Sequence, residues 1–232
     1  MTKTGTLVQL SFMPRIFPVN CYFVEEENSL TLIDAALPYS AKSIRNAAKK
    51  IGKPITRIIL THAHQDHIGA LDTLNELLPD CQVYISSRDA LLLSGNFELL
   101  PHEKNTPIRG GFSKNIKTKP DVLLEEGDRI GSLEVIATPG HTPGSITLFD
   151  TRNKGLIAGD AFVTVGNLAV SGMKNPLFPF PAFATWDKHT ALESAKKVSD
   201  YKPSLLAVGH GKMLEQPKEL LALAIAKAEM IF

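Results

Sequence analysis

Cysteine and net charge are both scarce in this 232-residue chain. The two cysteines, Cys21 and Cys81, are too few for a disulfide framework, and each lies in an apolar, strand-like run that predicts a buried thiol. Lys and Arg number 25 against 24 Asp and Glu, and no long block of one sign occurs. The sequence therefore indicates neither a nucleic acid nor a charged membrane surface as a partner.

Long apolar runs are also missing. No stretch of 18 or more apolar residues occurs, and the N-terminus, MTKTGTLVQLSF, lacks the basic region, the sustained apolar stretch and the small-residue cleavage site of a signal peptide. We expect a cytoplasmic protein without a membrane span. Apolar residues make up 44% of the chain, enough to bury a sizeable core at this length, and we expect one domain over residues 1–232.

Strand and helix patterns alternate along the chain. Short β-rich runs fill the first 35 residues, and a helical spacing over 40–51 begins at Ser40, a predicted N-cap, and ends before Gly52. Further strands are predicted over 55–60, 81–85, 121–126, 128–138, 145–151, 154–160 and 204–210, and further helices from about 67, over 87–95, near 186–199 and at the C-terminus, with a long loop through 96–120. This order predicts an α/β fold in which two mixed sheets pack face to face with helices outside, a four-layer α/β/β/α sandwich.

The segment THAHQDH at 61–67 concentrates three histidines and an aspartate directly after the apolar run ITRIIL. Side chains alternate faces in an extended chain, so His62 and His64 point the same way and can grip one ion. Asp66 and His67 then fall at the start of the next helix. The pattern arises by chance on the order of once in a million positions, so we interpret it as a metal site and not as solvated loop histidines. Asp66 by itself is also typical of a helix N-cap.

Three more candidate ligands stand at the ends of other predicted strands. His141 follows LEVIATPG, Asp160 ends GLIAGD and His210 ends LLAVGH. Each alone is equally typical of a hydrogen-bonded histidine or a turn aspartate, but their shared context at rigid strand ends favours ligands. His102 and His189 lack that context and are predicted to lie at the surface.

These motifs resemble those of the metallo-β-lactamase-fold hydrolases. THAHQDH, TPGHTPGS, GD and GHG follow the order of that family's H-x-H-x-D-H signature, later histidine, bridging aspartate and last histidine, over nearly the whole chain. The resemblance implies a metallo-β-lactamase-like sandwich with two metal ions. It further implies that Asp34, in LID at 32–34, supports the site from behind without coordinating metal. The implied ligands are His62, His64 and His141 for one ion, Asp66, His67 and His210 for the second, and Asp160 as a bridge.

The donor atoms indicate the metal and the chemistry. Imidazole nitrogens and carboxylate oxygens without thiolates suit two Zn²⁺ ions, with Fe or Mn as alternatives. Two ions roughly 3.5–4 Å apart can share a hydroxide, because a metal lowers the pKa of bound water toward about 7. We therefore expect hydrolysis of an ester-type bond, in a lactone, thioester or carboxylic ester, of a small and partly apolar molecule. Asp66 is in addition a candidate catalytic proton shuttle, a role with which metal ligation competes.

Departures from the family pattern bear on the substrate. Lactonases similar in size to this chain usually place a tyrosine three residues after the bridging aspartate, where this chain has Val163. This weakens the lactone assignment. Glyoxalase II-like thioesterases add a C-terminal helical domain, whereas 22 residues follow His210. The flavin domain of the diiron flavoproteins and the large insertion of the family nucleases are not found here. Asp160 argues against a zinc β-lactamase, since those with the same run of ligands usually lack it.

The segment NPLFPFPAFATW before His189 is predicted to line a substrate pocket. It offers Phe178, Phe180, Phe183 and Trp186 as an apolar wall, with the loop 96–120 opposite, although core packing or a contact in a homodimer explains the same residues equally well. Three other functions stay open. They are a mononuclear iron oxidoreductase of the persulfide-dioxygenase kind, which would use the positions of His62, His141 and Asp160; a phosphodiester hydrolase; and a non-catalytic, zinc-stabilised binding module.

Overall fold

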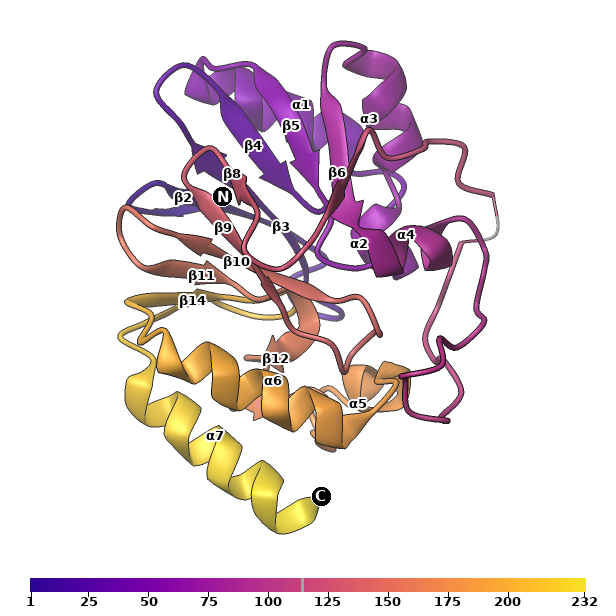
Figure 1. Ribbon diagram of the computed structural model, residues 1–232. Coiled ribbons are helices and arrows are strands. Elements are labelled where there is room, and N and C mark those ends of the chain that lie inside the picture. Colours follow the sequence, from indigo (N-terminus) through magenta and orange to yellow (C-terminus); the bar gives the residue numbers. More distant parts are fainter. Residues whose placement is uncertain (114) are drawn as a thin grey trace.

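The computed structural model describes residues 1–113 and 115–232, and most of its strands form two large sheets (Figure 1). The first sheet has seven strands in the order β1-β2-β3-β4-β5-β6-β7. They are β1 (Thr2–Thr4), β2 (Leu7–Phe12), β3 (Val19–Glu25), β4 (Leu30–Ile33), β5 (Ile55–Ile59), β6 (Gln82–Ser86) and β7 (Val122–Leu124). Strands β1 to β4 pair antiparallel and β4 to β7 pair parallel, so the sheet is mixed.

The second sheet is built from the later part of the chain, in the order β15-β14-β11-β10-β9-β8. Its strands are β8 (Arg129–Ile130), β9 (Leu133–Ala137), β10 (Ile146–Asp150), β11 (Gly155–Ile157), β14 (Leu205–Ala207) and β15 (Leu214–Glu215). Only the β11–β14 pair is parallel, so this sheet is mixed too. A separate short pair, β12 (Phe162–Val163) and β13 (Ala169–Val170), was not predicted from the sequence.

Helices lie on the outer faces of both sheets (Figure 1). The first sheet is flanked by α1 (Ala41–Ile51), α2 (Gln65–Ile68), α3 (Leu71–Leu77) and α4 (Ser87–Leu93), and the second by α5 (Phe180–Ala184), α6 (Lys188–Asp200) and α7 (Lys218–Ile231), with a 3₁₀ turn η1 (Gly159–Ala161). Within residues 1–113 and 115–232, every helix is too short or too polar to cross a membrane.

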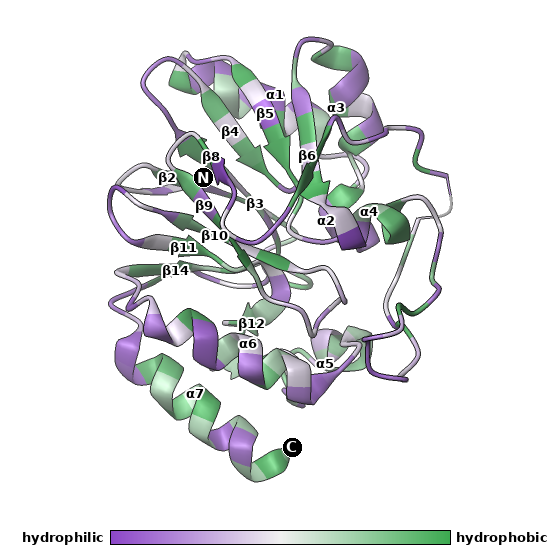
Figure 2. Ribbon diagram, viewed as in Figure 1, coloured by the Kyte–Doolittle hydropathy of each residue, from purple (hydrophilic) through white to green (hydrophobic). Residues whose placement is uncertain are grey.

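Three apolar clusters separate four layers, and neighbouring residues of one strand belong to different clusters. Leu32 packs between the first sheet and its helices, whereas Ile33 packs between the two sheets. Likewise Val135 faces the first sheet and Ile136 faces the helices of the second. This period of two is what a strand buried on both faces requires, and Figure 2 shows the resulting hydrophobic strands. The predicted α/β/β/α sandwich is confirmed.

The structure confirms one predicted end of the helix α1 and contradicts the other. Gly52 ends α1 in the left-handed region at φ 84°, as predicted. The predicted cap at Ser40 is wrong, because its backbone is helical and its side chain makes no capping bond. Its buried hydroxyl has no partner within residues 1–113 and 115–232. Strand β7, which follows the long loop, joins the first sheet and not the second, since it pairs parallel with β6. Residue 114 belongs to the predicted loop over 96–120 and lies outside the described residues.

Candidate metal centre

The predicted ligands and the supporting residue Asp34 converge from both sheets. In the first sheet, Asp34 follows β4, and residues 62–67 run from the end of β5 into α2. In the second sheet, His141 follows β9, Asp160 lies in η1 after β11, and His210 follows β14. The apolar strands are pinned by the core, so the short segments that follow them hold these side chains at defined positions. His102 and His189 are exposed elsewhere, as predicted.

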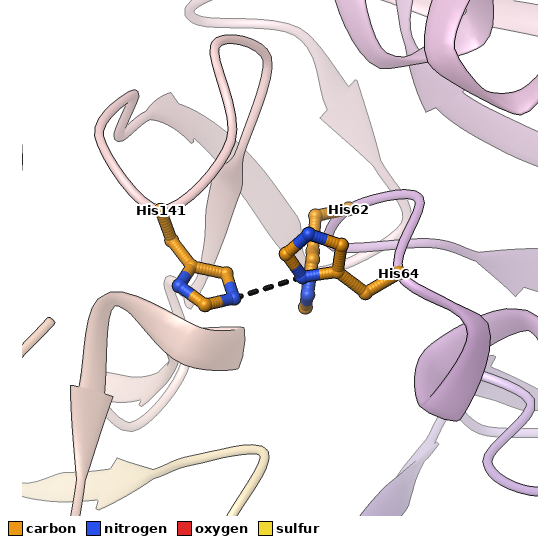
Figure 3. A group of neighbouring side chains, drawn as sticks. All are labelled: His62, His64 and His141. Atoms are coloured by element: carbon orange, nitrogen blue, oxygen red, sulfur yellow. Dashed lines mark hydrogen bonds between the residues drawn. The ribbon is translucent and has the colours of Figure 1, made fainter. Parts of the chain in front are cut away.

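One group, the three-histidine cluster, comprises His62, His64 and His141 (Figure 3). Nδ1 of His64 lies 2.9 Å from Nε2 of His141, and each of the three residues offers a nitrogen within 4.8 Å of the others. All three side chains are buried. Figure 3 shows the rings reaching toward one another from two separate stretches of chain. The arrangement can hold one cation.

A second group, the mixed cluster, comprises Asp66, His67 and His210. Oδ2 of Asp66 lies 3.4 Å from Nε2 of His210, and the ligand atoms of all three residues lie within 4.8 Å of one another. His67 and His210 are buried, whereas the Asp66 side chain is 20% exposed. The mixed cluster is therefore the one that solvent reaches through a ligand side chain.

Asp160 stands between the two clusters. Its Oδ2 lies 3.4 Å from Nε2 of His141 and 3.1 Å from Nε2 of His210, and its Oδ1 lies 3.3 Å from Nε2 of His67. His62, His67 and Asp160 also form a third group of ligand atoms within 4.8 Å of one another. One carboxylate thus faces nitrogens of both clusters, the position that a bridging ligand requires.

Each of the five histidines has its outer ring nitrogen beside a fixed protein atom. A partner of this kind fixes the tautomer and orientation of a metal-binding imidazole. The contacts are His62 Nδ1 with Thr61 Oγ1 (3.1 Å), His64 Nε2 with the Arg109 carbonyl (2.9 Å), His67 Nδ1 with Asp34 Oδ2 (2.8 Å), His141 Nδ1 with Ser171 Oγ (2.9 Å) and His210 Nδ1 with the Pro18 carbonyl (2.6 Å). The inner nitrogens are left to face the centre.

Asp34 lies behind the centre and not within either cluster. Its backbone is in the left-handed region at φ 62°, which is strained for a residue with a Cβ. Its carboxylate accepts hydrogen bonds from the Thr61 amide and hydroxyl, both at 2.8 Å, besides facing His67. Asp34 therefore fixes the segment that starts the histidine run as well as one of its rings.

Several buried atoms of the centre have no hydrogen-bond partner among the described residues. They are Nε2 of His62, Nε2 of His67 and Oδ1 of Asp160. Buried polar atoms without partners are costly, and all three belong to the residues that face the centre. Imidazole and carboxylate donors in this arrangement fit divalent transition metals. The residues present therefore fit a divalent metal cofactor.

The two clusters differ in their proton affinities. Burial lowers the pKa of His62, His64 and His141 below the ordinary value of an imidazole. Burial acts in the same direction on His67 and His210, but the charge of Asp160 outweighs it, and the pKa of both residues is raised. The three-histidine cluster thus favours neutral imidazoles, whereas the charge of Asp160 favours protonation of His67 and His210.

A cavity of about 650 Å³ opens in front of the centre. Its walls include His64 and His141 of one cluster and Asp66 and His210 of the other, together with Asp160. Its apolar lining comes from Phe17, Leu37, Pro38, Ile116, Phe180, Pro181, Phe183 and Ala184, and Gly110, Gly111 and Ser113 of the long loop add a further side.

The four residues of the predicted aromatic wall occupy different places. Phe180 and Phe183 line the cavity, but Phe178 and Trp186 do not. Phe178 is buried against the rings of Phe17 and His210, and the indole of Trp186 donates to the Thr106 carbonyl and lines a separate cavity. The helical turn α5 leaves Phe180 and Phe183 largely exposed, which a linear pattern rich in proline does not reveal.

Sequence reasoning missed the backbone partners of the histidines. The Arg109 and Pro18 carbonyls lie far along the chain from the rings they contact, and a carbonyl has no sequence signal. Gly110 does carry one: a Cβ there would overlap the His64 ring, so only glycine allows the loop to lie against it. The paired glycines of RGG at 109–111 are that signal.

Comparison with known proteins gives the family. The profile of the metallo-beta-lactamase superfamily matches residues 14–210. YobT of Bacillus subtilis (strain 168), an uncharacterized protein, is 56% identical over 229 residues, covering 99% of this chain and 98% of YobT. YflN of the same organism, described as a probable metallo-hydrolase, is 37% identical over 212 residues, covering 83% of this chain and 80% of YflN.

Two more distant matches are a dioxygenase and a structure with bound iron. The human mitochondrial persulfide dioxygenase ETHE1 is 30% identical over 158 residues, which cover 64% of this chain and 51% of ETHE1. The crystal structure of TTHA1623 in a di-iron-bound form superposes with a TM-score of 0.67 at 25% identity, covering 91% of this chain and 96% of that one. Because the superfamily profile spans most of the chain and two relatives align over most of their length, this chain belongs to the metallo-β-lactamase superfamily.

Proposed function

We propose that this chain is a dinuclear metallohydrolase that cleaves an ester-type bond, in a lactone, thioester or carboxylic ester, of a small and partly apolar molecule. The observation that carries the proposal is the position of Asp160, whose two oxygens face nitrogens of both the three-histidine and the mixed cluster. Two ions sharing one carboxylate account for that position, and this supports a dinuclear centre.

The proposed ligands divide as the clusters do, and the preferred ion is Zn²⁺, with Fe or Mn as alternatives. When bound, such a pair of ions lowers the pKa of water and polarises the oxygen of the bond to be cleaved. One ion is assigned to His62, His64 and His141, the other to Asp66, His67 and His210, and Asp160 to both.

Residues around the ligands have supporting roles in this proposal. Asp34 accepts from Nδ1 of His67 and so leaves Nε2 of that ring as a donor to metal. Asp66 lies at the cavity wall with its side chain 20% exposed, where a carboxylate oxygen can hold a proton for the leaving group. The contact of Asp34 and the exposure of Asp66 support these two roles, and metal ligation by Asp66 competes with the second.

The cavity supports a partly apolar substrate. Phe180, Phe183 and Ile116 line it on the sides away from the ligands. Val163 is buried and offers no side-chain donor to the substrate, so a different group must supply that hydrogen bond. Gln65 and Ser113 are uncharged polar side chains that line the cavity and are candidates for it.

Metal quantification combined with a hydrolysis panel tests the proposal. The panel holds a lactone, a thioester, an aryl ester, a β-lactam and a phosphodiester, and each is offered to the native protein and to the Asp160→Ala and His64→Ala variants. We expect two ions per native chain, activity on at least one ester-type substrate, and loss of that activity in both variants. His189→Ala replaces an exposed histidine outside the centre and is the matched control, with activity unchanged.

Other results would point to other functions. One iron per chain, together with oxygen consumption in the presence of a persulfide, would indicate a persulfide dioxygenase like ETHE1 and not a hydrolase. Cleavage of the phosphodiester alone would indicate a phosphodiester hydrolase and not an enzyme that cleaves esters of carboxylic acids. Two tightly held ions with no activity on any substrate would favour a zinc-stabilised binding module.

A further inference from the structure

Asp89 is a buried acid that belongs to neither metal cluster and does not line the cavity in front of them. It lies in the first turn of α4, where an acid ordinarily serves the exposed amides of its own helix. That end of α4 is already capped, because the Ser86 hydroxyl accepts from the Asp89 amide at 3.1 Å. The Asp89 carboxylate is therefore free for another task.

The carboxylate accepts hydrogen bonds from both chain segments that carry the three-histidine cluster. Oδ2 accepts from the Ala63 amide at 2.8 Å and from the Thr142 hydroxyl at 2.9 Å, and Oδ1 accepts from the Gly144 amide at 2.9 Å. Ala63 stands between His62 and His64, and Thr142 directly follows His141. One side chain thus touches the immediate neighbours of all three ligands.

Two further contacts join these stretches of chain: Nδ1 of His64 lies 2.9 Å from Nε2 of His141, and just outside the segments the Ile146 amide donates to the Thr61 carbonyl at 2.9 Å. Asp89 adds hydrogen bonds to each segment from a third element. Residues 62–64 follow β5 of the first sheet, and residues 141–144 join β9 and β10 of the second. The packing at Asp89 is close: a Cβ on Gly144 would lie 2.5 Å from the Asp89 amide and 2.6 Å from Oδ1. The Ser86 hydroxyl also donates to the Gly144 carbonyl at 2.6 Å, so α4 holds this segment from two sides.

We propose that Asp89 is a positioning residue that sets the separation of the segments 62–64 and 141–144, and through it the metal affinity of the three-histidine cluster alone. The inference rests on the proposed function, because it assumes that this cluster holds an ion. The mixed cluster reaches its partners through other contacts, with Asp34 behind His67 and the Pro18 carbonyl behind His210. A substitution of Asp89 should therefore lower the metal affinity of the three-histidine cluster only.

Asparagine cannot take over this role. Both Asp89 oxygens accept from backbone amides, so either orientation of an asparagine side chain sets its NH₂ group against an amide donor.

Burial raises the pKa of Asp89 to about 6, although the hydrogen bonds from Thr142, Ala63 and Gly144 lower it. Above that pH the carboxylate is ionised and accepts hydrogen bonds at both oxygens.

The test measures metal affinity in two backgrounds that each leave one cluster intact. In His210→Ala the three-histidine cluster is complete, and in His64→Ala the mixed cluster lacks none of its three residues. Zn²⁺ affinity is measured by competition with a chromophoric chelator, with and without Asp89→Asn. We expect Asp89→Asn to weaken Zn²⁺ binding roughly 10- to 100-fold in the His210→Ala background and by less than about threefold in the His64→Ala background.

Two controls separate positioning from general stability. Asp150→Asn removes another buried carboxylate, which pairs with Arg152 and Thr6 away from the centre, and should lower the melting temperature without changing Zn²⁺ affinity in either background. Thr142→Val removes a hydroxyl bound by Asp89 and should weaken Zn²⁺ binding in the His210→Ala background. Thr142→Ser keeps the hydroxyl and should bind Zn²⁺ as tightly as the His210→Ala background does. These two variants test the proposal even if Asp89→Asn fails to fold.

The outcomes are distinguishable. Equal loss of affinity in both backgrounds, or a loss matched by Asp150→Asn, would reduce Asp89 to a stabilising residue and overturn the inference while the proposed function stands. Unchanged affinity with Asp89→Asn and Thr142→Val would overturn it as well. A native chain that takes up no Zn²⁺, iron or manganese would remove the proposed function and the inference together.

Discussion

The three-histidine cluster and the mixed cluster occupy the same end of the fold but differ in charge and surroundings. The first offers three buried imidazoles whose pKa is lowered by burial. The second offers a partly exposed carboxylate and two imidazoles whose pKa is raised by Asp160 despite burial. An ion in the first cluster would keep more of its positive charge than an ion in the second, since neutral ligands neutralise none of it. Under the proposed function, the ion in the three-histidine cluster would therefore be the stronger electrophile of the two.

The largest expected effect comes from the residue that the clusters share. Asp160→Ala should bring metal content below one ion per chain and lower hydrolysis roughly 10³-fold or more, because it removes a ligand from both proposed sites. His210→Ala, which touches only the mixed cluster, should leave about one ion per chain. Elemental analysis after gel filtration measures both. Equal metal content in the two variants would mean that Asp160 does not belong to both sites.

A smaller effect is expected behind the mixed cluster. Asp34→Asn replaces the oxygen that faces Nδ1 of His67 and should weaken binding of the ion assigned to the mixed cluster roughly 10- to 100-fold. A smaller loss, within a few-fold, is expected at the three-histidine cluster, because Asp34 also binds Thr61, the partner of His62. Chelator competition resolves the two affinities. The variant is the counterpart of Asp89→Asn on the opposite cluster. The comparison between clusters would break if the two variants weakened the same ion.

In metal-free protein the clusters should titrate apart. His62 and His141, with lowered pKa, should stay neutral well below pH 6.5. The protein therefore loses stability as pH falls below about 6.5, because these histidines bind protons in the unfolded chain but not in the folded one. His67 and His210, with raised pKa, contribute the opposite: their stabilisation is present below about pH 6.5 and is lost as pH rises through their folded values. Imidazole NMR measures both, and a single shared titration near pH 6.5 would contradict the distinction.

The smallest effect should lie at the cavity wall that both clusters face. Phe183 is 66% exposed, so Phe183→Ala should cost little stability. It should raise the KM of substrates with an apolar substituent roughly 3- to 10-fold and leave kcat unchanged, because it removes apolar contact and no ligand. Leu220→Ala, at an exposed position of α7 that does not line the cavity, is the matched control. A fall in kcat with KM unchanged would show that Phe183 acts on the reaction and not on binding.

Local sequence carried much of the fold and the composition of the centre. Short β-rich and apolar runs predicted the strands β4, β5 and β9, and the spacing in THAHQDH predicted that His62 and His64 share a side. These are short-range properties, fixed by the two-residue repeat of a strand and by the chemistry of imidazole. The order of His141, Asp160 and His210 at strand ends was likewise visible in the sequence.

Tertiary structure alone decided the rest. Nothing in the sequence indicates that Asp89 contacts residues 63, 142 and 144, that the Arg109 carbonyl faces His64, or that Phe178 is buried while Phe180 is exposed. Strand β7 follows the long loop and pairs parallel with β6, which places it in the first sheet. Such contacts join residues tens of positions apart through backbone groups that every residue carries. Residue types therefore set which atoms could bind a metal, and the packing of the two sheets set which of them meet.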